Sequence, residues 1–344
     1  MRTAILSVGL LVACGDNLPG FEPWYLGELS AQEGVWVRTP EFEVAPGEEI
    51  QDCYFFEIPP QGVDPLWVDR FQLALNPGSH HMNVFRVSTI RSLDPTSGEP
   101  IDLGGVAGTV IRGGECWKAP NWAGWPMVVN SQQSSERAPV YEWQLPDNVA
   151  TRFVAGERLM LQVHYVNAST QETPFRGRAG LNLHRSRNDT VELGTLFATQ
   201  QSIRICRSTP PPVYSGTCSM PVGDHKVAAV NGHFHSRGQR FSVYAWDGVS
   251  TERPADSARF YQSQAWAEPE MLNGLEVPLP PGGGIWWTCE YQWREPEIGC
   301  AMVDARDPMQ ANDCCYTFGP TVETSEHCNV FLFYYPKTQD IVCF

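Results

Sequence analysis

Apolar and polar residues alternate in short runs along this chain from Val35 onward. An alternation with a period of two is typical of strands that bury one face. Pro- and Gly-rich turns separate the runs, and no long helical period appears. The pattern therefore predicts an all-β protein built of antiparallel, jelly-roll-like β-sandwiches. The clearest predicted strands are residues 51–58, 67–75, 82–87, 159–166, 228–235, 241–245 and 329–335.

The length of the chain, 344 residues, is enough for two ordinary domains. A polar stretch at residues 184–190 lies near the middle and is a plausible junction. We therefore predict an N-terminal domain at residues 31–187 and a C-terminal domain at residues 188–344. Residues 15–30 show little periodicity and are predicted to be a tether.

The N-terminus has the features of an export signal. Arg2 is followed by an apolar stretch at residues 4–13, which is too short to span a bilayer. This stretch ends Leu11-Val12-Ala13-Cys14, which resembles a bacterial lipobox. We predict that residues 1–14 form a signal peptide with a lipobox and that Cys14 carries lipid. The alternative is an ordinary signal cleaved nearby. The chain is thus predicted to be an exported bacterial lipoprotein of the cell envelope, in the periplasm or on the outer surface.

Charge and cysteine content restrict the possible partners and the compartment. A net charge of −15 argues against binding to nucleic acid or to an anionic membrane, so membrane contact is expected only through Cys14. Without Cys14, ten cysteines remain, and an even number in an exported chain indicates disulfides. The alternative, a metal site built of cysteine thiolates, is disfavoured because the sequence contains no C-x-x-C pair. Cys53 and Cys116 are predicted to pair, because they are the only two cysteines in the predicted first domain. Cys343 is expected to pair with Cys218 or Cys206.

Six of the eight histidines lie in patterns that suit metal binding. Neutral imidazole is a common ligand of copper and zinc. The simplest partition is two sites of three histidines, one in each half of the chain. His184 and His225 have no partner at metal-binding spacing and are predicted to be structural. The six candidate ligands are His80, His81, His164, His233, His235 and His327.

Local geometry explains how neighbouring histidines can share an ion. On a strand, residues i and i+2 point to one face, so His233 and His235 can chelate. Adjacent residues point to opposite faces, so His80 and His81 need an irregular backbone, and the turn at residues 76–79 offers one.

The order of these motifs adds specificity. The chain contains Gly78-Ser79-His80-His81-Met82, Leu161-Gln162-Val163-His164-Tyr165, His233-Phe234-His235 and His327-Cys328-Asn329, in that order. In this it closely resembles the copper type II, ascorbate-dependent monooxygenases, the family of peptidylglycine alpha-hydroxylating monooxygenase and dopamine beta-monooxygenase. The resemblance extends from about residue 50 to residue 344.

The resemblance implies two β-sandwich domains, each holding one copper ion, that face each other across a solvent-filled gap. His80, His81 and His164 would bind the copper that supplies electrons. His233 and His235, with His327, would bind the catalytic copper that activates O2. Ascorbate would reduce both ions, and the enzyme would insert one oxygen atom into a C–H bond of a small-molecule substrate.

The resemblance also implies roles for residues near the second set of histidines. Cys289 would pair with Cys328, beside the third ligand. Asn329 is kept from the family pattern and would contact the substrate. We expect Gln162 to point to the strand face opposite His164, and we assign it no role.

The chain departs from the family pattern at three positions. His327 stands where the family has a methionine, and imidazole tolerates Cu(II) better than a thioether does. Asn231 precedes the H-x-H motif where peptidylglycine hydroxylases carry an arginine that holds the substrate carboxylate. Phe331 stands where those enzymes use a tyrosine. A glycine-extended peptide is therefore not the expected substrate, and the substrate is left unidentified.

The sequence thus predicts a copper-dependent monooxygenase. One alternative is a non-catalytic copper-binding or electron-transfer protein on the same scaffold. Another is a zinc hydrolase, since three histidines with an open position also form a catalytic zinc site, but no carboxylate base is evident near the H-x-H motif. Met302 or Met309 is an alternative third ligand to His327. Trp117, Trp122 and Trp125 are expected mainly to pack in the core.

Overall fold

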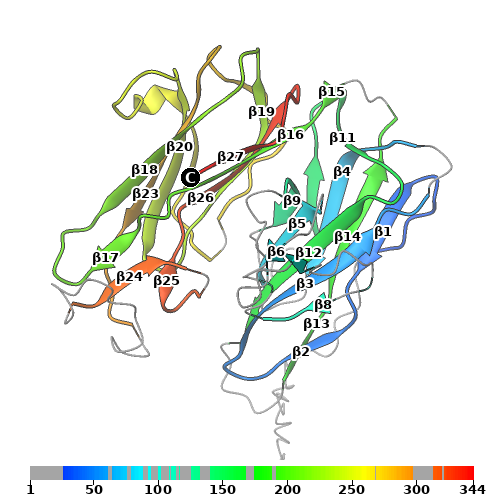
Figure 1. Ribbon diagram of the computed structural model, residues 1–344, viewed down its shortest axis with the longest axis horizontal. Coiled ribbons are helices and arrows are strands. Elements are labelled where there is room, and N and C mark those ends of the chain that lie inside the picture. The colour runs from blue at the N-terminus through cyan, green and yellow to red at the C-terminus, as the bar shows by residue number, and fades with distance from the viewer. Residues whose placement is uncertain are drawn as a thin grey trace, which may run out of the picture.

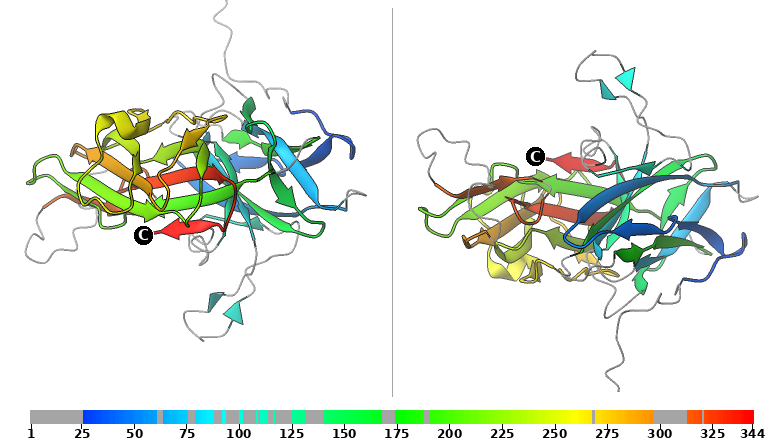
Figure 2. Two further views of the ribbon diagram at one scale, coloured as in Figure 1. Left: turned by 90° about the horizontal axis from the view of Figure 1, so that it is seen from above. Right: turned by 90° about the horizontal axis from the view of Figure 1, so that it is seen from below.

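Two β-sandwiches lie side by side in the computed structural model of the chain (Figures 1 and 2). Strands make up nearly all of the regular secondary structure of the described residues, and one short 3-10 helix, η2 (Asp256–Ala258), lies among them. The prediction of an all-β protein made of antiparallel sandwiches is confirmed. The structure describes residues 26–60, 64–75, 79–87, 92–93, 100–101, 108, 110–113, 116, 125–131, 140–167, 174–187, 191–267, 269–296, 313–319 and 321–344.

The first sandwich consists of two main sheets and two small ribbons. One sheet has the order β1 (Gly34–Arg38), β14 (Ala179–Arg185), β4 (Leu66–Leu75), β11 (Val149–Phe153), β15 (Val191–Glu192), and β10 (Val140–Gln144) also pairs with β4. The other has the order β8 (Val110–Ile111), β3 (Glu49–Glu57), β12 (Arg158–Val166), β5 (Ser79–Arg86), β9 (Met127–Ser131). The ribbons pair β2 (Phe42–Val44) with β13 (Phe175–Gly177), and β6 (Ser92–Leu93) with β7 (Pro100–Ile101).

The second sandwich has the same two-layered plan. One sheet has the order β22 (Val277–Pro278), β19 (Lys226–His233), β26 (Asn329–Tyr335), β16 (Gly194–Thr199), β27 (Ile341–Cys343). The other has the order β18 (Val213–Ser219), β23 (Gly284–Tyr291), β20 (Gly238–Trp246), β21 (Arg259–Ser263). A small third sheet joins β17 (Arg204–Cys206), β24 (Cys315–Phe318) and β25 (Ser325–Glu326).

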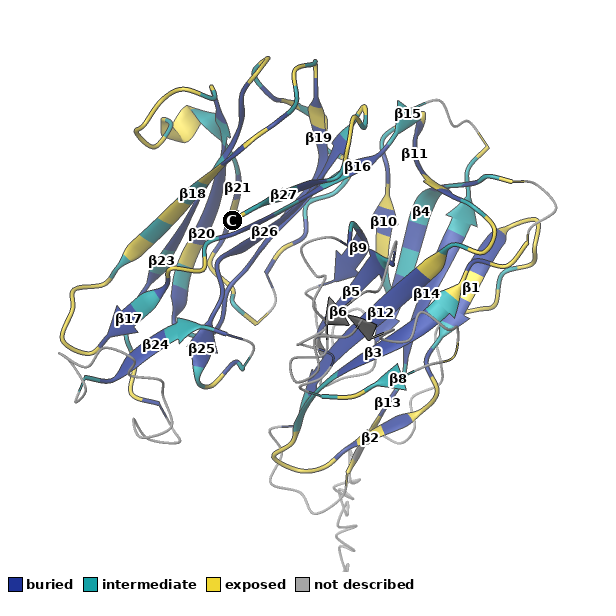
Figure 3. Cartoon of the chain, in the orientation of Figure 1, coloured by how far each residue is buried: buried dark blue, intermediate teal, exposed yellow. Residues whose placement is uncertain are grey.

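The seven predicted runs all fall on strands, with small differences at their ends. The run at 329–335 matches β26 in full. The strand predicted at 228–235 lies two residues earlier than expected, because β19 begins at Lys226 and ends at His233. Strands at the centre of the sheets, such as β12 and β26, are buried along almost their whole length (Figure 3).

The chain passes from the first sandwich to the second later than predicted. The predicted boundary lies between residues 187 and 188. The structure instead keeps β15 in the first sandwich, where Val191 and Glu192 pair in parallel with β11. The next strand, β16, starts at Gly194 and belongs to the second sandwich. The polar stretch therefore precedes a final edge strand of the first domain.

The apolar core of the first sandwich continues into the second. Phe331 and Phe333 of β26 belong to the cluster formed mainly by the first sandwich. The ring of Phe333 meets that of Trp143 edge-on, with 4.7 Å between the ring centroids. The two sandwiches thus share a continuous buried apolar cluster.

Four disulfides are present within the described residues. Cys53–Cys116, Cys289–Cys328 and Cys218–Cys343 confirm the expected pairs. Cys206 pairs with Cys315, directly opposite on the neighbouring strand. Cys314 is disulfide-bonded as well. These bonds fit an oxidising, exported location. In the described part of the chain, no helix is long and apolar enough to cross a membrane. Residues 1–25, with the predicted signal, Cys14 and most of the tether, lie outside that part.

Candidate metal centre

The first histidine set lies where β5 and β12 pair. His81 stands opposite His164 in the antiparallel register, and their ring centroids are 4.7 Å apart. The register shifts by one residue next to this pair, so that Tyr165 faces Ser79 and His80 is skipped. Such a bulge is the irregular backbone that two adjacent histidine ligands require. The side chain of His80 lies outside the described residues.

Glu49 contacts the first set. Its Oε1 lies 2.7 Å from Nε2 of His164, and the His164 side chain is almost fully buried. Because an ionised carboxylate can only accept, Nε2 carries the proton in this bond. The neutral ring then presents the lone pair of Nδ1. A carboxylate that fixes the tautomer in this way is the usual partner of a metal-binding histidine.

The second set comes from the end of β19 and from the segment between β25 and β26. Nitrogen atoms of His233, His235 and His327 all lie within 4.8 Å of one another. The three side chains are buried. Phe234 lies in the core of the second sandwich, stacked on Phe241 with 5.9 Å between the ring centroids. The alternation of the chain therefore places the aromatic ring in the core and the flanking histidines at the site.

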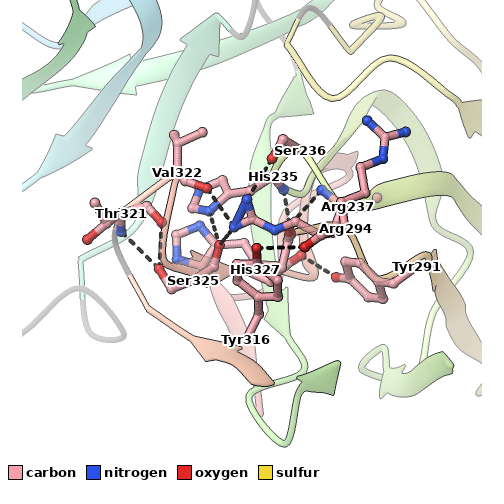
Figure 4. A network of polar contacts seen from close by, with 12 residues as sticks. His235, Ser236, Arg237, Tyr291, Arg294, Tyr316, Thr321, Val322, Ser325 and His327 are labelled. Carbon is pink, nitrogen blue, oxygen red and sulfur yellow. Dashed lines mark hydrogen bonds and ion pairs between the residues drawn. The ribbon is translucent and has the colours of Figure 1, made fainter. Parts of the chain in front are cut away.

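A buried ion pair holds the segments that carry this set (Figure 4). The Glu326 carboxylate accepts hydrogen bonds from the backbone N–H groups of His235, at 2.8 Å, and Arg237, at 2.9 Å. Nε of Arg237 lies 2.9 Å from the same carboxylate. The guanidinium also donates to the carbonyls of Val322 and Ser325, at 2.7 and 2.9 Å. One ion pair therefore joins the loop after β19 to β25.

Further hydrogen bonds orient individual ligands. Nδ1 of His235 lies 2.9 Å from the carbonyl oxygen of Ser325. Since a carbonyl only accepts, Nδ1 carries the proton and Nε2 keeps its lone pair in the neutral ring. The hydroxyl of Tyr291 donates to the carbonyl of His327.

Burial shapes the electrostatics of the second set. Burial, with a smaller contribution from His164, lowers the pKa of His327 to about 3. The imidazole is therefore neutral, which is the form that binds metals. Burial raises the pKa of Glu326 to about 7, an effect that Arg237 opposes.

The two sets meet across the boundary between the sandwiches. The resemblance implies a solvent-filled gap between them, but the ring of His81 contacts that of His233, with 5.3 Å between the centroids. Close by, Nδ2 of Asn130 on β9 donates to Oδ1 of Asn231 on β19, at 3.3 Å. The five candidate ligands whose side chains are described, His81, His164, His233, His235 and His327, thus form one cluster.

The strand face to which Gln162 points differs from our expectation. Residues two apart share a strand face, so Gln162 lies on the same face as His164, and our prediction of the opposite face is wrong. Its Oε1 accepts a hydrogen bond from Nδ2 of Asn83 at 3.0 Å, and Asn83 is two residues from His81. Gln162 therefore belongs to the layer next to the first set.

Asn329, the predicted substrate contact, lies opposite His233 in the register of β19 and β26. Its Oδ1 accepts a hydrogen bond from the Thr199 hydroxyl at 2.7 Å. Phe331, two residues further, is stacked on Phe197. Asn329 is thus adjacent to the second set, while Phe331 packs in the core.

The remaining candidates are structural or lie outside the described residues. Nδ1 of His184 is 2.9 Å from the Arg70 guanidinium, and its Nε2 is 2.7 Å from Oε1 of Gln72. His225 is buried between backbone carbonyls. Trp125 packs edge-on against Phe55. Trp117, Trp122, Met302, Met309 and Cys300 lie outside the described residues.

Sequence reasoning missed Glu49, Arg237 and Glu326. Two of them could have been found from their closeness in the sequence to candidate ligands. Glu326 immediately precedes His327, and Arg237 lies two residues after His235. Glu49 has none, because it meets His164 only through the pairing of β3 with β12.

The chemistry of the donors fits copper. Both sets offer imidazole nitrogens, a ligand type that suits Cu(II), Cu(I) and zinc. Neither set contains a thioether or thiolate among the described residues. The grouping of Cys206, Asp313 and Cys315 does not form a rival site, because its two cysteines are bonded to each other.

Comparisons with known proteins add no function. No protein-family model and no curated protein matches this chain. One similar solved structure is that of broad bean stain virus, with a TM-score of 0.33, 9% identity and coverage of 98% of this chain and 100% of that chain. Another is the major capsid protein P2 of bacteriophage PM2, with a TM-score of 0.28, 8% identity and coverage of 87% and 97%. A third is the N-terminal CBM22-1-CBM22-2 tandem domain of a Paenibacillus barcinonensis protein, with a TM-score of 0.18, 10% identity and coverage of 90% and 85%. Similarities this low carry no argument about what this chain does.

Proposed function

We propose that this protein is a copper-dependent monooxygenase that uses O2 and ascorbate to hydroxylate a C–H bond of a small-molecule substrate. The observation that carries the proposal is the convergence of histidines from separate strands and loops of both sandwiches into one buried cluster. The order of the motifs resembles the copper type II monooxygenases. Burial of several imidazoles side by side is costly for a fold, and a shared metal ion would offset that cost.

The residues divide into ligands and residues that orient them. His81 and His164, with His80, would hold one copper ion, and His233, His235 and His327 would hold the other. Bound copper supplies electron transfer from ascorbate and the activation of O2. Glu49 holds the proton on Nε2 of His164, and the Ser325 carbonyl holds that on Nδ1 of His235. Burial excludes water, which protects reactive species from side reactions.

The surroundings favour an uncharged substrate. Asn231 stands where peptidylglycine hydroxylases carry their arginine, and its amide oxygen is bonded to Asn130. The nearby guanidinium of Arg237 is neutralised by Glu326. Asn329, opposite His233, would contact such a substrate through its amide.

A second candidate function is non-catalytic copper binding or electron transfer. The burial of the cluster favours it, because His81, the most exposed of its five histidines, is only 4% exposed. The replacement of the family methionine by His327 also favours it, because a three-imidazole site holds Cu(II) well. A zinc hydrolase is disfavoured, because the carboxylate of Glu326 is committed to Arg237 and to backbone N–H groups.

The proposed location is the bacterial cell envelope, with Cys14 as the lipid anchor. The disulfides support export. Metabolic labelling with a fatty-acid analogue tests the anchor, because a Cys14→Ser protein should lose the label.

One experiment separates these functions. The mature protein is reconstituted with copper, ascorbate is added, and oxygen uptake is measured with panels of amine, aromatic and peptide substrates. A monooxygenase consumes oxygen in proportion to hydroxylated product. Reduction of copper by ascorbate without substrate-dependent uptake would support the electron-transfer function instead. Metal analysis of the protein as isolated, showing zinc in place of copper, would contradict both.

A further inference from the structure

We infer that the histidines form a single binuclear centre, in which the rings of His81 and His233 contact each other where the two ligand sets meet. This inference rests on the proposed binding of copper. It differs from an arrangement of two sites separated by solvent, which the sequence resemblance implies.

The first observation is an unbroken series of ring contacts. From His164 to His81, the ring centroids are 4.7 Å apart, and from His81 to His233 they are 5.3 Å apart. From His233 to His327 the distance is 5.1 Å, and from His327 to His235 it is 4.5 Å. The step between the sandwiches, at 5.3 Å, is thus only slightly longer than the steps of 4.5 to 5.1 Å within the sets.

The second observation is the absence of room for solvent at that step. The residues that make it, His81 and His233, are 4% and 2% exposed. Rings in edge-on contact leave no layer of water between them. At this contact the two ligand sets therefore meet ring against ring.

The third observation is that packing on several sides fixes the two sandwiches at this contact. Near the rings, Asn130 donates to Asn231 across the boundary. Farther along, Trp143 meets Phe333 edge-on. The Tyr141 hydroxyl donates to the carbonyl of Met271 at 3.0 Å. The contact between His81 and His233 is therefore built into the interface of the sandwiches.

Two consequences follow for the bound ions. The contacting rings of His81 and His233 would give an electron a path between the two ligand sets without a water gap. The unpaired spins of two Cu(II) ions held by these sets would interact magnetically, whereas ions separated by a wide solvent gap would behave as two isolated centres.

Electron paramagnetic resonance on the fully oxidised protein tests this directly. The probe is Cu(II) alone, added until metal analysis shows two ions per chain. We expect the integrated signal to fall below two spins per chain and a half-field transition to appear. A normal signal of two spins without a half-field transition would overturn the inference while leaving the proposed function intact. A chain that binds no copper would overturn both.

Two single-histidine variants serve as controls. His164→Ala removes a ligand of the first set, so we expect one copper ion with the full intensity of one isolated spin. This result shows that the lost intensity of the unmodified protein comes from coupling and not from reduction of the metal. His225→Ala removes a buried histidine outside the cluster, whose ring packs against Tyr334. It should keep two ions and the coupling.

Discussion

At the scale of single residues, His164 of the first set and His235 of the second set differ in their hydrogen-bond partners. His164 has a carboxylate partner in Glu49, whereas His235 has a backbone carbonyl. A carboxylate partner raises the basicity of the ring more than a neutral carbonyl does, and a more basic ligand stabilises Cu(II) over Cu(I). The first copper should therefore have the lower reduction potential, which suits the donation of electrons to the second.

Glu49→Gln tests that difference. The change keeps the size of the side chain but removes its charge. We expect the reduction potential of the first copper to rise and its Cu(II) affinity to fall by roughly 10- to 100-fold. Glu48→Gln is a matched control, because the Glu48 carboxylate accepts from the backbone N–H of Ala45. Potentiometry and competitive titration measure both. Equal behaviour of the two variants would mean that Glu49 does not orient His164.

His327→Met tests the third ligand of the second set. A thioether favours Cu(I), so the potential of that copper should rise. X-ray absorption of the Cu(I) form should show a copper–sulfur path in the variant and none in the unmodified protein. A copper–sulfur path in the unmodified protein that survives His327→Ala would show that a methionine, such as Met302 or Met309, is the real ligand.

His184 predicts a dependence of stability on pH. Burial and then the charge of Arg70 lower its pKa below the usual 6.5. The unfolded chain therefore binds this proton more tightly than the folded chain, so the contribution of His184 is present above about pH 6.5 and is lost as the pH falls through the lowered pKa. Urea unfolding at about pH 7.5 and at about pH 5 measures the free energy of unfolding. On acidification, His184→Asn should lose less of this free energy than the unmodified protein does. Parallel curves for the two proteins would contradict this assignment.

At the scale of elements, loop segments that would otherwise be loose carry the second ligand set. His235 follows β19 and His327 precedes β26, so neither is held by strand pairing. The pair of Arg237 and Glu326 replaces those missing bonds, and the disulfide between Cys289 and Cys328 ties the same segment to β23. The site is thus preorganised by its supports.

Glu326→Gln should therefore weaken both the fold and the second site. It leaves the guanidinium of Arg237 buried without its countercharge, which costs about 3–5 kcal/mol. Copper affinity should fall at the second set only. Chemical unfolding and copper titration at about pH 8, where the carboxylate is ionised, measure these effects. The exposed Glu323 of the same loop offers the control Glu323→Gln. A Glu326→Gln protein as stable as that control would refute the supporting role.

At the scale of the whole molecule, the two sandwiches are expected to unfold together. Phe333 is fully buried and packs on Trp143 of the other sandwich. Phe333→Ala should lower the free energy of unfolding by about 3–5 kcal/mol. Calorimetry should show one transition moving to lower temperature. Phe344→Ala, at a position 72% exposed, should leave the transition in place. Two separate transitions in the unmodified protein would show that the sandwiches are independent.

Much of this architecture could be predicted from local pattern. Alternation locates strands because it reports which face of a strand is buried, and β26 was predicted to the residue. The histidines and the pair Cys53–Cys116 were predictable because spacing and number limited the choices. The alternation predicts the ends of strands less accurately than their centres, as at His235. Strand ends depend on turns, and turns show little periodicity.

By itself, then, the sequence determined the all-β class, the candidate ligands and the cysteines available for pairing. Only the tertiary structure decided that Glu49 orients His164, that Cys206 pairs with Cys315 and not with its neighbour Cys314, and that His81 meets His233. Each of these contacts joins residues far apart in the chain. Such contacts depend on sheet register and on how two sandwiches pack, which a period of two along one strand does not encode.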